Sequence, residues 1–310
     1  MTLSDQEWIT KHLKPLMVAG KTLLAQTDTL PSKPPTYDKG DWTGLKLLLE
    51  KYYLKIYLDI LGKRGYRVAY VDLFAGPGLN RIGKANTPIP GSPLIPIMIS
   101  ESKYNFSAFV FSETNSDYIN ALKKRIELAK GSILAAVEVF QEDANLVVKQ
   151  LPNIMKKYDI SHALVFIDPE GLQFIWSSME NLVKCIDCDL IINFPSVGVN
   201  RNLQNKLMTK NIREFLGPGS ETIPPNADEE WALNVYRSNL GSVGKDISTE
   251  IKIDSGQAFH YHLIPAVRKT AGGSPWFDAL REAKKRIERC PGPILRIIAD
   301  QIDGRQDTLG

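Results

Sequence analysis

The chain has 310 residues, of which 43% are hydrophobic and 24% are charged, a balance typical of a folded globular protein and not of a disordered one. Its 38 basic and 35 acidic residues give a formal net charge of +3, so only a local cluster of charge would indicate a nucleic-acid partner. No apolar run reaches the roughly 18–20 residues of a membrane span, and the acidic N-terminus is unlike a secretory signal. Three cysteines form no disulfide framework. We therefore expect a cytoplasmic protein without membrane contact.

The first 41 residues predict a short helix followed by an irregular arm, because prolines interrupt the segment at positions 15, 31, 34 and 35. Between 43 and 61 the apolar residues recur at helical spacing, and this helix is expected to end near Gly62. The sequence thus predicts an N-terminal arm over 1–41 and a folded domain from residue 42 onward.

Short apolar runs and helical patterns alternate through the middle of the chain. The runs, which predict strands, are 68–74, 107–112, 136–140, 163–167 and 189–193; the helical patterns are 94–103, 116–130, 144–157 and 174–184. Such alternation is typical of a parallel sheet covered by helices on both faces. The sequence therefore predicts an α/β fold with a doubly wound, Rossmann-like sheet.

In the last third of the chain, short apolar runs no longer alternate with helical patterns. Helices are expected at 200–216 and 228–240, within a helical insertion at about 197–245. Thr249–Ile253 and Ala258–Ala266 flank Asp254-Ser-Gly256, which predicts a β-hairpin. A basic helix over 275–289 and a polar C-terminal tail over 291–310 complete the chain. A parallel five-stranded sheet finished by an antiparallel hairpin matches the class I methyltransferase plan, with the domain at 42–290.

A glycine-rich string, Asp72-Leu-Phe-Ala-Gly-Pro-Gly78, follows the first strand. Small residues in such a turn let backbone N–H groups approach a ligand where a Cβ would clash. A dinucleotide site needs a third glycine, which is missing here, and the acid before the turn would repel a pyrophosphate. The string therefore favours S-adenosylmethionine over a dinucleotide, with a turn that binds no ligand as the other alternative. The expected cofactor contacts in it are Asp72, Phe74, Ala75, Gly76 and Gly78.

The string is followed by a long loop over 79–92, which is expected to be either a lid or substrate-contacting segment, or a surface loop.

Acidic residues stand at the ends of four predicted strands: Asp72, Glu113, Asp143 and Asp168. Ligands of doubly wound sheets bind outside the carboxyl ends of the strands, so these side chains are expected at one site. Glu113 is suited to chelate both ribose hydroxyls of the cofactor. Asp143 is suited to accept a hydrogen bond from the adenine amino group, or it is simply a helix N-cap.

The reactive edge is expected after the fourth and fifth strands, at Phe166-Ile-Asp-Pro-Glu-Gly171 and Asn193-Phe-Pro195. A carboxylate and a carbonyl held by proline can accept both hydrogens of an exocyclic amine and so localise its lone pair toward a methyl donor. Asp168, Pro169 and Asn193 are the catalytic candidates. Gly171 replaces the aromatic residue usual two positions after the proline, and Phe174 or Phe194 is the expected substitute for stacking on a base.

Other chemistries are less favoured. No cysteine stands beside a proline at this edge, as a cytosine-C5 enzyme would require. Cys185 and Cys188 have the spacing of half a zinc site, but no second pair completes it. His260 and His262 share one face of a strand and are expected to have a structural or substrate-binding role. We expect no metal.

Basic residues cluster in two segments. Arg201, Lys206, Lys210 and Arg213 occur without an acid between them, and the last three are spaced for one helix face. Arg281, Lys285 and Arg289 form a second row. Either could contact the phosphates of nucleic acid, or form an ordinary solvated helix face. The first cluster is the expected nucleic-acid-binding surface, because Arg201 directly follows the reactive edge.

Several strings in the same order resemble the three-Cys-motif partner proteins (TcmP): Trp42-Thr-Gly-Leu-Lys46, Tyr70–Gly78, Gly91-Ser-Pro93, Phe166–Gly171, Asn193-Phe-Pro195 with Asn200-Arg201, and Tyr261-His-Leu263. The resemblance spans about residues 42–285. It implies a class I methyltransferase-like fold and a partner protein with a radical-SAM-like three-cysteine motif. The glycine-rich string also resembles motif I of amino-methyltransferases.

Two functions follow as hypotheses. The leading one is an S-adenosylmethionine-dependent methyltransferase that acts on nucleic acid, DNA or RNA, at a base nitrogen. The alternative is a non-catalytic protein of methyltransferase fold that serves a neighbouring three-cysteine-motif enzyme or a defence system.

Overall fold

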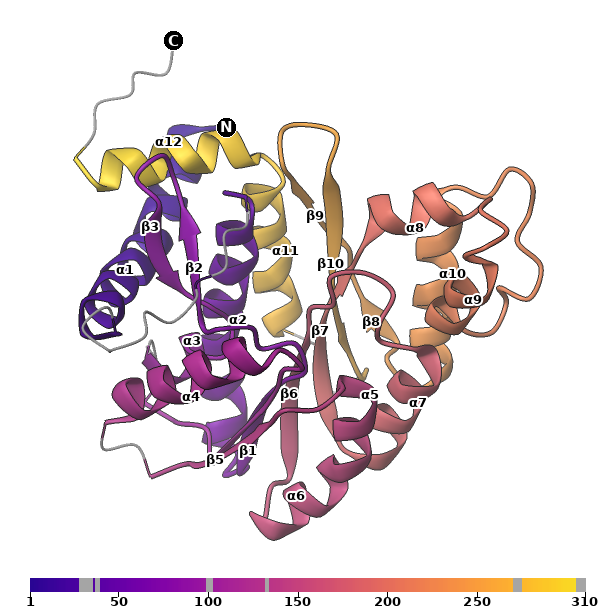
Figure 1. Cartoon of the computed structure of the whole chain (residues 1–310), viewed down its shortest axis with the longest axis horizontal. Coiled ribbons are helices and arrows are strands. Elements are labelled where there is room, and N and C mark those ends of the chain that lie inside the picture. The colour runs from indigo at the N-terminus through magenta and orange to yellow at the C-terminus, as the bar shows by residue number, and fades with distance from the viewer. Residues whose placement is uncertain (28–35, 37–39, 99–102, 132–133, 270–274, 305–310) are drawn as a thin grey trace.

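The computed structural model describes residues 1–27, 36, 40–98, 103–131, 134–269 and 275–304. A mixed sheet stands at the centre with helices on both sides (Figure 1). Its parallel strands lie in the order β5-β4-β1-β6-β7. They are β1 (Val68–Asp72), β4 (Ala108–Ser112), β5 (Ala136–Phe140), β6 (His162–Ile167) and β7 (Cys188–Phe194). Each lies on an apolar run for which a strand is expected, so the doubly wound plan is confirmed.

The sheet is completed by an antiparallel strand. β10 (His260–Val267) pairs with β7, with Leu263 opposite Asn193, and β9 (Ile251–Asp254) and β8 (Ile247–Ser248) pair with its other edge. Gly256 in the turn between β9 and β10 has a φ of +75°, a conformation that favours glycine. The expected antiparallel hairpin is therefore confirmed.

Most of the expected helices between strands are present. They are α2 (Thr43–Lys63), α4 (Ser116–Lys130), α5 (Ala144–Val147), a 3-10 turn at Val148–Gln150, α6 (Leu151–Lys157), α7 (Trp176–Cys185) and α11 (Pro275–Ile287). Of the helix expected over 94–103, α3 (Ile95–Met98) covers the start, and 99–102 lie outside the described residues.

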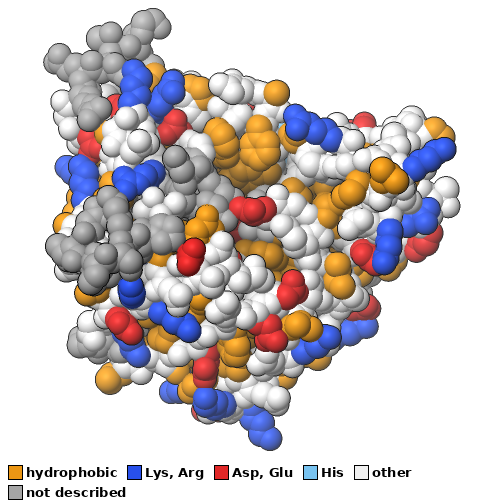
Figure 2. Space-filling view, in the orientation of Figure 1, with side chains coloured by type: hydrophobic (Ala, Val, Ile, Leu, Met, Phe, Trp, Pro, Cys, Tyr) orange, Lys and Arg blue, Asp and Glu red, His pale blue; other side chains and the backbone are white. Residues whose placement is uncertain are grey.

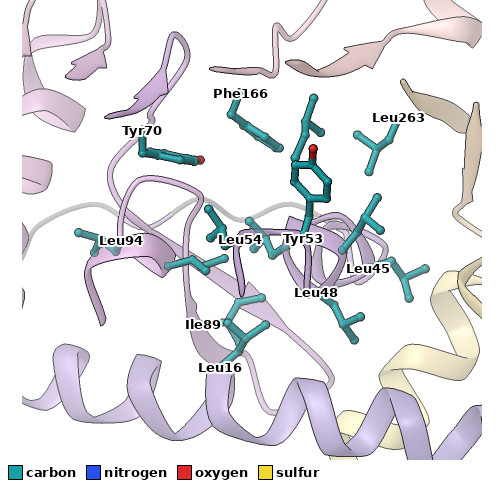
Figure 3. Packing of buried hydrophobic residues seen from close by; sticks show 14 of the residues in the cluster. Leu16, Leu45, Leu48, Tyr53, Leu54, Tyr70, Ile89, Leu94, Phe166 and Leu263 are labelled. Carbon is teal, nitrogen blue, oxygen red and sulfur yellow. The ribbon is translucent and has the colours of Figure 1, made fainter. Parts of the chain in front are cut away.

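Side chains alternate between the two faces of the sheet. Along β1, Tyr70 packs with one buried cluster and Val71 with the other, as the two-residue period of a strand requires. The first cluster lies between the sheet and α2, and Figure 3 shows Leu48 and Leu54 of α2 between the strands and the helix that carries Leu16. Helix α2 is thus a central, buried element, which explains why its first nine residues, 43–51, are all buried.

The short helix expected at the start of the N-terminal arm is present but longer than expected, and it extends over residues 3–27. These form one helix, α1 (Leu3–Thr27), which continues through Pro15. A proline inside a helix removes one hydrogen bond and disturbs the turn before it. Burial of Ile9, Leu13 and Leu16 offsets that cost. The other prolines of the segment lie outside the described residues.

The loop expected over 79–92 is a β-hairpin, β2 (Leu79–Ile82) and β3 (Thr87–Pro90), and not a surface loop. Leu79, Ile82 and Ile89 are fully or almost fully buried. Helix α1 packs directly on this hairpin: a Cβ on Gly20 would lie 2.2 Å from the carbonyl oxygen of Pro88. The hairpin is therefore packed into the core.

The C-terminal segment also differs from expectation. Instead of a polar tail from 291, α12 (Gly292–Ile302) packs Leu295, Ile298 and Ala299 into the core. These three residues have the i, i+3, i+4 spacing of an amphipathic helix. Residues 305–310 lie outside the described part.

Three helices follow β7 in the segment for which a helical insertion is expected: α8 (Ser196–Asn202), α9 (Thr209–Leu216) and α10 (Glu229–Ser242), at the right in Figure 1. The prediction of a single helix over 200–216 is wrong, because a turn at 203–208 separates α8 from α9. Lys206 lies in that turn and so does not share a helix face with Lys210 and Arg213. Within the described ranges, no helix is long and apolar enough to cross a membrane.

Candidate functional site

The carboxyl ends of β1, β4, β5 and β6 border a cavity of about 380 Å³, here called the cofactor cavity. Its walls include the expected residues Phe74, Ala75, Gly76, Gly78, Glu113, Asp143 and Asp168. The cavity lies where the strand order reverses on either side of β1, which is the usual ligand position in such sheets. The structure therefore brings together the expected cofactor contacts, with Asp72 as the exception.

The glycine turn is held from two sides. Gly76 and Gly78 have φ values of +61° and +84°, so both positions favour glycine. Glu113 Oε2 accepts a hydrogen bond from the Gly76 N–H at 2.9 Å. From α4, the fully buried Arg125 donates through Nη1 to the Pro77 carbonyl at 2.6 Å. Arg125 was missed by the sequence analysis, although its position between Leu122 and Ile126 indicates the buried face of that helix.

Asp72 lies behind the turn and does not line the cavity. Its Oδ1 accepts from the Phe74 N–H at 3.0 Å, while Oδ2 makes no hydrogen bond of normal geometry to any residue that the structure describes. Burial raises the pKa of Asp72 to about 7, against the lowering effect of the Ser92 hydroxyl and the Phe74 amide. In this structure Asp72 shapes the turn, and its expected contact with the cofactor stays a prediction.

Asp143 is a helix N-cap and also borders the cofactor cavity. Its Oδ1 accepts from the Asn145 N–H at 2.8 Å and from Asn145 Nδ2 at 2.9 Å, so it is the N-cap of α5. It also lines the cofactor cavity. One side chain therefore fixes the helix and remains available to a ligand.

The cofactor cavity is acidic. Lys46 is the one basic side chain among the described residues that line it. The acidic ones are Glu113, Glu142, Asp143, Asp168 and Glu170. This charge favours a cationic ligand and disfavours a pyrophosphate.

A second cavity of about 460 Å³, here called the acceptor cavity, adjoins the first. The two share Lys46, Asp168, Glu170 and Gln173 as lining residues. Its remaining walls carry aromatic rings, amide side chains and the edge of β7, namely Trp42, Phe259, Tyr261, Asn193, Pro169, Pro195, Asn202 and Asn211. Figure 2 shows hydrophobic side chains together with acidic ones near the hollowed centre of this face.

Asp168 stands between the two cavities and is held by two partners. Its Oδ1 accepts from Asn193 Nδ2 at 2.7 Å, and its Oδ2 forms an ion pair with Lys46 Nζ. The side chains of Lys46 and Asp168 are 8% and 15% exposed, so water screens the pair only weakly. Two of the three expected catalytic residues, Asp168 and Asn193, are therefore in direct contact.

Further carboxyl groups lie beneath the pair. Fully buried Glu50, one turn after Lys46, accepts a hydrogen bond from the Tyr70 hydroxyl at 2.6 Å. Burial raises the pKa of Glu50 well above its ordinary value, and the nearby charge of Asp72 adds to this. The Lys46 ammonium is thus the cation that faces a group of buried acids. Lys46 and Glu50 were missed by the sequence analysis; their signal is a charged i, i+4 pair, with Lys46 inside the run Leu45–Leu49 and Glu50 directly after it.

The prediction that Phe174 or Phe194 stacks on a base is wrong. Phe174 and Phe194 are 1% and 0% exposed and belong to the core. In their place Trp42 and Phe259 line the acceptor cavity, with ring centroids 5.6 Å apart. Phe259 is 43% exposed. Trp42 and Phe259 lie outside the strand-end motifs, so the spacing of those motifs gave no indication of them.

Two buried polar atoms of the acceptor cavity have no partner among the described residues: Asn193 Oδ1 and the Tyr261 hydroxyl. Buried polar groups are normally hydrogen-bonded. Both residues line the cavity, so a bound polar molecule can satisfy these atoms.

Among the residues that the structure describes, no cysteine or histidine lines either cavity. Cys185 is exposed and Cys188 is buried, and burial raises the pKa of Cys188 to about 12. His260 Nε2 lies 2.8 Å from Glu229 Oε2, and His262 Nδ1 lies 2.7 Å from Ser196 Oγ. Within the described part of the chain, no group of three His, Cys, Asp or Glu side chains could hold a metal.

The basic residues differ in their partners. Arg201, Lys206 and Arg213 are exposed on α8, α9 and the turn between them, and Lys210 has only a long ion pair of 3.7 Å with Glu214. The second row is largely neutralised: Arg281 pairs with Asp278, Lys285 with Glu282, and Arg289 with Asp5. The first cluster adjoins the acceptor cavity, which Asn202, Met208 and Asn211 line.

No protein-family model matches the chain, and no curated protein is significantly similar to it. The resemblance to TcmP proteins therefore stays a prediction.

Solved structures show partial similarity. Protein LPL1258 of Legionella pneumophila, from the family DUF519, is 14% identical, with a TM-score of 0.49 over 77% of this chain and 91% of that one. Trm1 of Pyrococcus horikoshii with S-adenosyl-L-methionine is 12% identical, with a TM-score of 0.40 over 76% and 58%. An O-methyltransferase of Bacillus cereus in complex with SAH is 11% identical, with a TM-score of 0.39 over 82% and 100%. At these values the similarity assigns neither a family nor a substrate.

Proposed function

We propose that the protein is an S-adenosylmethionine-dependent methyltransferase that acts on a base nitrogen of nucleic acid. The observation that carries the proposal is the Asp168 carboxylate, which lines both the acidic cofactor cavity and the aromatic acceptor cavity. Group transfer requires donor and acceptor to meet at one point, and these two cavities meet at Asp168.

The residues of the cofactor cavity fit S-adenosylmethionine. Its acidic lining suits a ligand that carries a sulfonium and an ammonium group. Glu113 can accept hydrogen bonds from ribose hydroxyls and Asp143 from an adenine amino group. Two of the similar solved structures contain S-adenosyl-L-methionine or SAH, which supports this cofactor. When bound, the cofactor supplies an activated methyl group.

The residues that line the acceptor cavity include possible acceptors for amine hydrogens. These are the Asp168 carboxylate, the Pro169 carbonyl and Asn193 Oδ1, which has no partner among the described residues. An amine that donates both hydrogens to such acceptors keeps its lone pair directed toward the donor. Asn193 and Lys46 hold Asp168 for this role, while Trp42 and Phe259 offer faces on which a base can stack.

The nucleic-acid substrate is supported by the surface around the acceptor cavity. Arg201, Lys206, Lys210 and Arg213 carry positive charge on α8, α9 and their connecting turn, and these elements lie at the right in Figure 1. Phosphates flanking a base in the cavity would meet these side chains. Trm1, one of the similar solved structures, shares the fold only partly and adds no substrate assignment.

Titration calorimetry with S-adenosylmethionine tests the cofactor assignment. We expect one site per chain, and competition by S-adenosylhomocysteine. If neither compound binds, the fold serves as a scaffold, and the alternative of a non-catalytic protein takes the place of the enzyme. A three-cysteine-motif partner rests on the sequence resemblance alone.

A further inference from the structure

A third cavity, of about 330 Å³, lies at the amino ends of the strands, where β6 and β7 begin. The cofactor cavity lies at the opposite, carboxyl ends. One wall is the second half of α2, and the other consists of residues at or near the strand ends. The lining residues are Tyr53, Tyr57, Ile60, Leu61, Arg64, Tyr66, His162, Asp187, Asp189, Arg268 and Lys269. None of them lines the cofactor or acceptor cavity, so methyl transfer does not account for this cavity.

The interior of this cavity combines aromatic rings with hydrogen-bond acceptors. The ring centroids of Tyr53 and Tyr57 lie 6.2 Å apart on α2. The Tyr53 hydroxyl donates to Asp189 Oδ2 at 3.3 Å, and the Tyr57 hydroxyl lies 2.7 Å from His162 Nδ1. Asp189 Oδ1 is 3.9 Å from His162 Nε2, beyond hydrogen-bond distance. This carboxylate oxygen can therefore accept from a ligand.

His162 adds no positive charge beside Asp189; the cations near that carboxylate are Lys245, whose ammonium donates to the Cys188 carbonyl, and Arg268. Burial lowers the pKa of His162 to about 4, so its imidazole is neutral at pH 7. Asp187, the second acid, is already paired with Arg268. The inner wall thus favours a flat ring that carries N–H donors.

The mouth of the cavity is positive. Arg64 and Lys269 are exposed, and neither side chain forms an ion pair or hydrogen bond with another described residue. Guanidinium and ammonium groups at such a position are suited to a phosphate. An acceptor at the back and free cations at the mouth select a ligand with a donor-bearing ring at one end and an anion at the other.

We propose that this cavity binds a nucleoside monophosphate, with the base against Tyr53 and Tyr57, base N–H groups on Asp189, and the phosphate on Arg64 and Lys269. The volume lies within the range of small-molecule pockets, roughly 300–1,000 Å³. The site is separate from the proposed methyltransferase site and does not depend on it.

The test is calorimetric titration of AMP and of adenosine into the full-length protein. S-Adenosylhomocysteine is present at saturation, because the cofactor cavity could itself accept adenosine. We expect AMP to bind about tenfold more tightly than adenosine, since the phosphate adds charged contacts. GMP, CMP and UMP in the same titration report the base preference.

Variants assign the binding to this cavity. Arg64→Ala is expected to weaken AMP binding about tenfold and to leave adenosine binding unchanged. Asp189→Asn, which keeps the shape of the side chain, is expected to weaken both. The matched control is Lys63→Ala, which removes the same charge one position earlier, outside the lining. Undetectable binding of all four nucleotides, or AMP binding insensitive to both variants, overturns the proposal.

A free nucleotide and the phosphorylated end of a nucleic-acid strand present the same chemistry. Displacement of AMP by a short 5′-phosphorylated oligonucleotide assigns the site to strand ends. Retention of AMP under the same conditions assigns it to free nucleotides. In both cases the Arg64→Ala effect must persist.

Discussion

The Lys46 ammonium on α2 forms an ion pair with the Asp168 carboxylate at the end of β6, 122 residues away in the chain. Both residues line the cofactor cavity and the acceptor cavity, so the pair lies where the two cavities meet. Burial raises the pKa values of nearby Glu50 and Asp72, the charge of Asp168 adds to this, and the Lys46 ammonium opposes it. Lys46 is thus a positioning residue for the carboxylate that the proposed chemistry uses.

Removing this lysine should destabilise the protein. Lys46→Met leaves Asp168 as an uncompensated, largely buried charge, and we expect a loss of about 3 kcal/mol in the free energy of unfolding. The double variant Lys46→Met with Asp168→Asn should recover most of the loss, because no uncompensated charge remains. Lys55→Met is the control on the same helix: its pair with Asp59 is exposed, and the change should stay within about 0.5 kcal/mol. Additive effects in a urea double-mutant cycle would show that the pair has no energetic coupling.

Glu113 should determine cofactor affinity. Glu113→Gln retains the shape but loses one acceptor oxygen, and the side chain already accepts from the Gly76 and Asn115 N–H groups. We expect affinity for S-adenosylmethionine to fall by about tenfold or more, with a small change in melting temperature. Asp117→Asn, in the first turn of α4 outside the cavity, should bind as the wild type does. Equal affinity in both variants would exclude Glu113 as a contact.

Asp72 gives the stability of the fold a particular pH dependence. Its folded-state pKa of about 7 exceeds the ordinary value of 3.8, so the native state holds a proton that the unfolded chain releases. The resulting stabilisation is complete below about pH 4 and is lost as the pH rises through 7. Asp72→Asn, which resembles the protonated form, should therefore raise the melting temperature relative to wild type more at pH 8 than at pH 5. A difference that is constant or larger at pH 5 would contradict the assignment.

Nucleic-acid binding should depend on salt through the cluster on α8 and α9. For duplex DNA the logarithm of the binding constant falls with the logarithm of salt concentration, with a slope of roughly −0.9 per phosphate neutralised. Reversal of Arg201, Lys210 and Arg213 to Glu should flatten this slope. Reversal of Arg281 and Lys285, which already pair with acids on α11, is the control and should change it less. Fluorescence anisotropy with DNA and RNA oligonucleotides measures both.

The strands were accessible to sequence reasoning because each is a short apolar run followed by a polar turn. In a parallel sheet the carboxyl ends of the strands all lie at the same end of the sheet. Glu113, Asp143 and Asp168 could therefore be grouped from the sequence, and all three line the cofactor cavity. Parts of the chain that pack through single long-range contacts were not accessible. The close contact of Gly20 on α1 with Pro88 of β3 is one of them, whereas the helical spacing of Ile9, Leu13 and Leu16 across Pro15 was readable from the sequence.

The candidate site shows the same division. Asp168 and Asn193 come from motifs at strand ends, and the structure joins them. Lys46, Trp42 and Phe259 complete the site from helix and hairpin segments that motif spacing does not connect to it. A charged residue inside an apolar helical run, such as Lys46, is the signal that could have identified one of them.

Methyl transfer from radiolabelled S-adenosylmethionine to nucleic acid, compared between wild type and Asp168→Asn at saturating cofactor, tests the proposed function most directly. Asparagine keeps the shape but replaces one acceptor oxygen with a donor that opposes an amine hydrogen. The account predicts wild-type incorporation into DNA or RNA and a decrease of about 100-fold or more in the variant, with cofactor affinity retained. Incorporation at the wild-type rate by a normally folded Asp168→Asn variant, or no incorporation by the wild type into either nucleic acid, would contradict it.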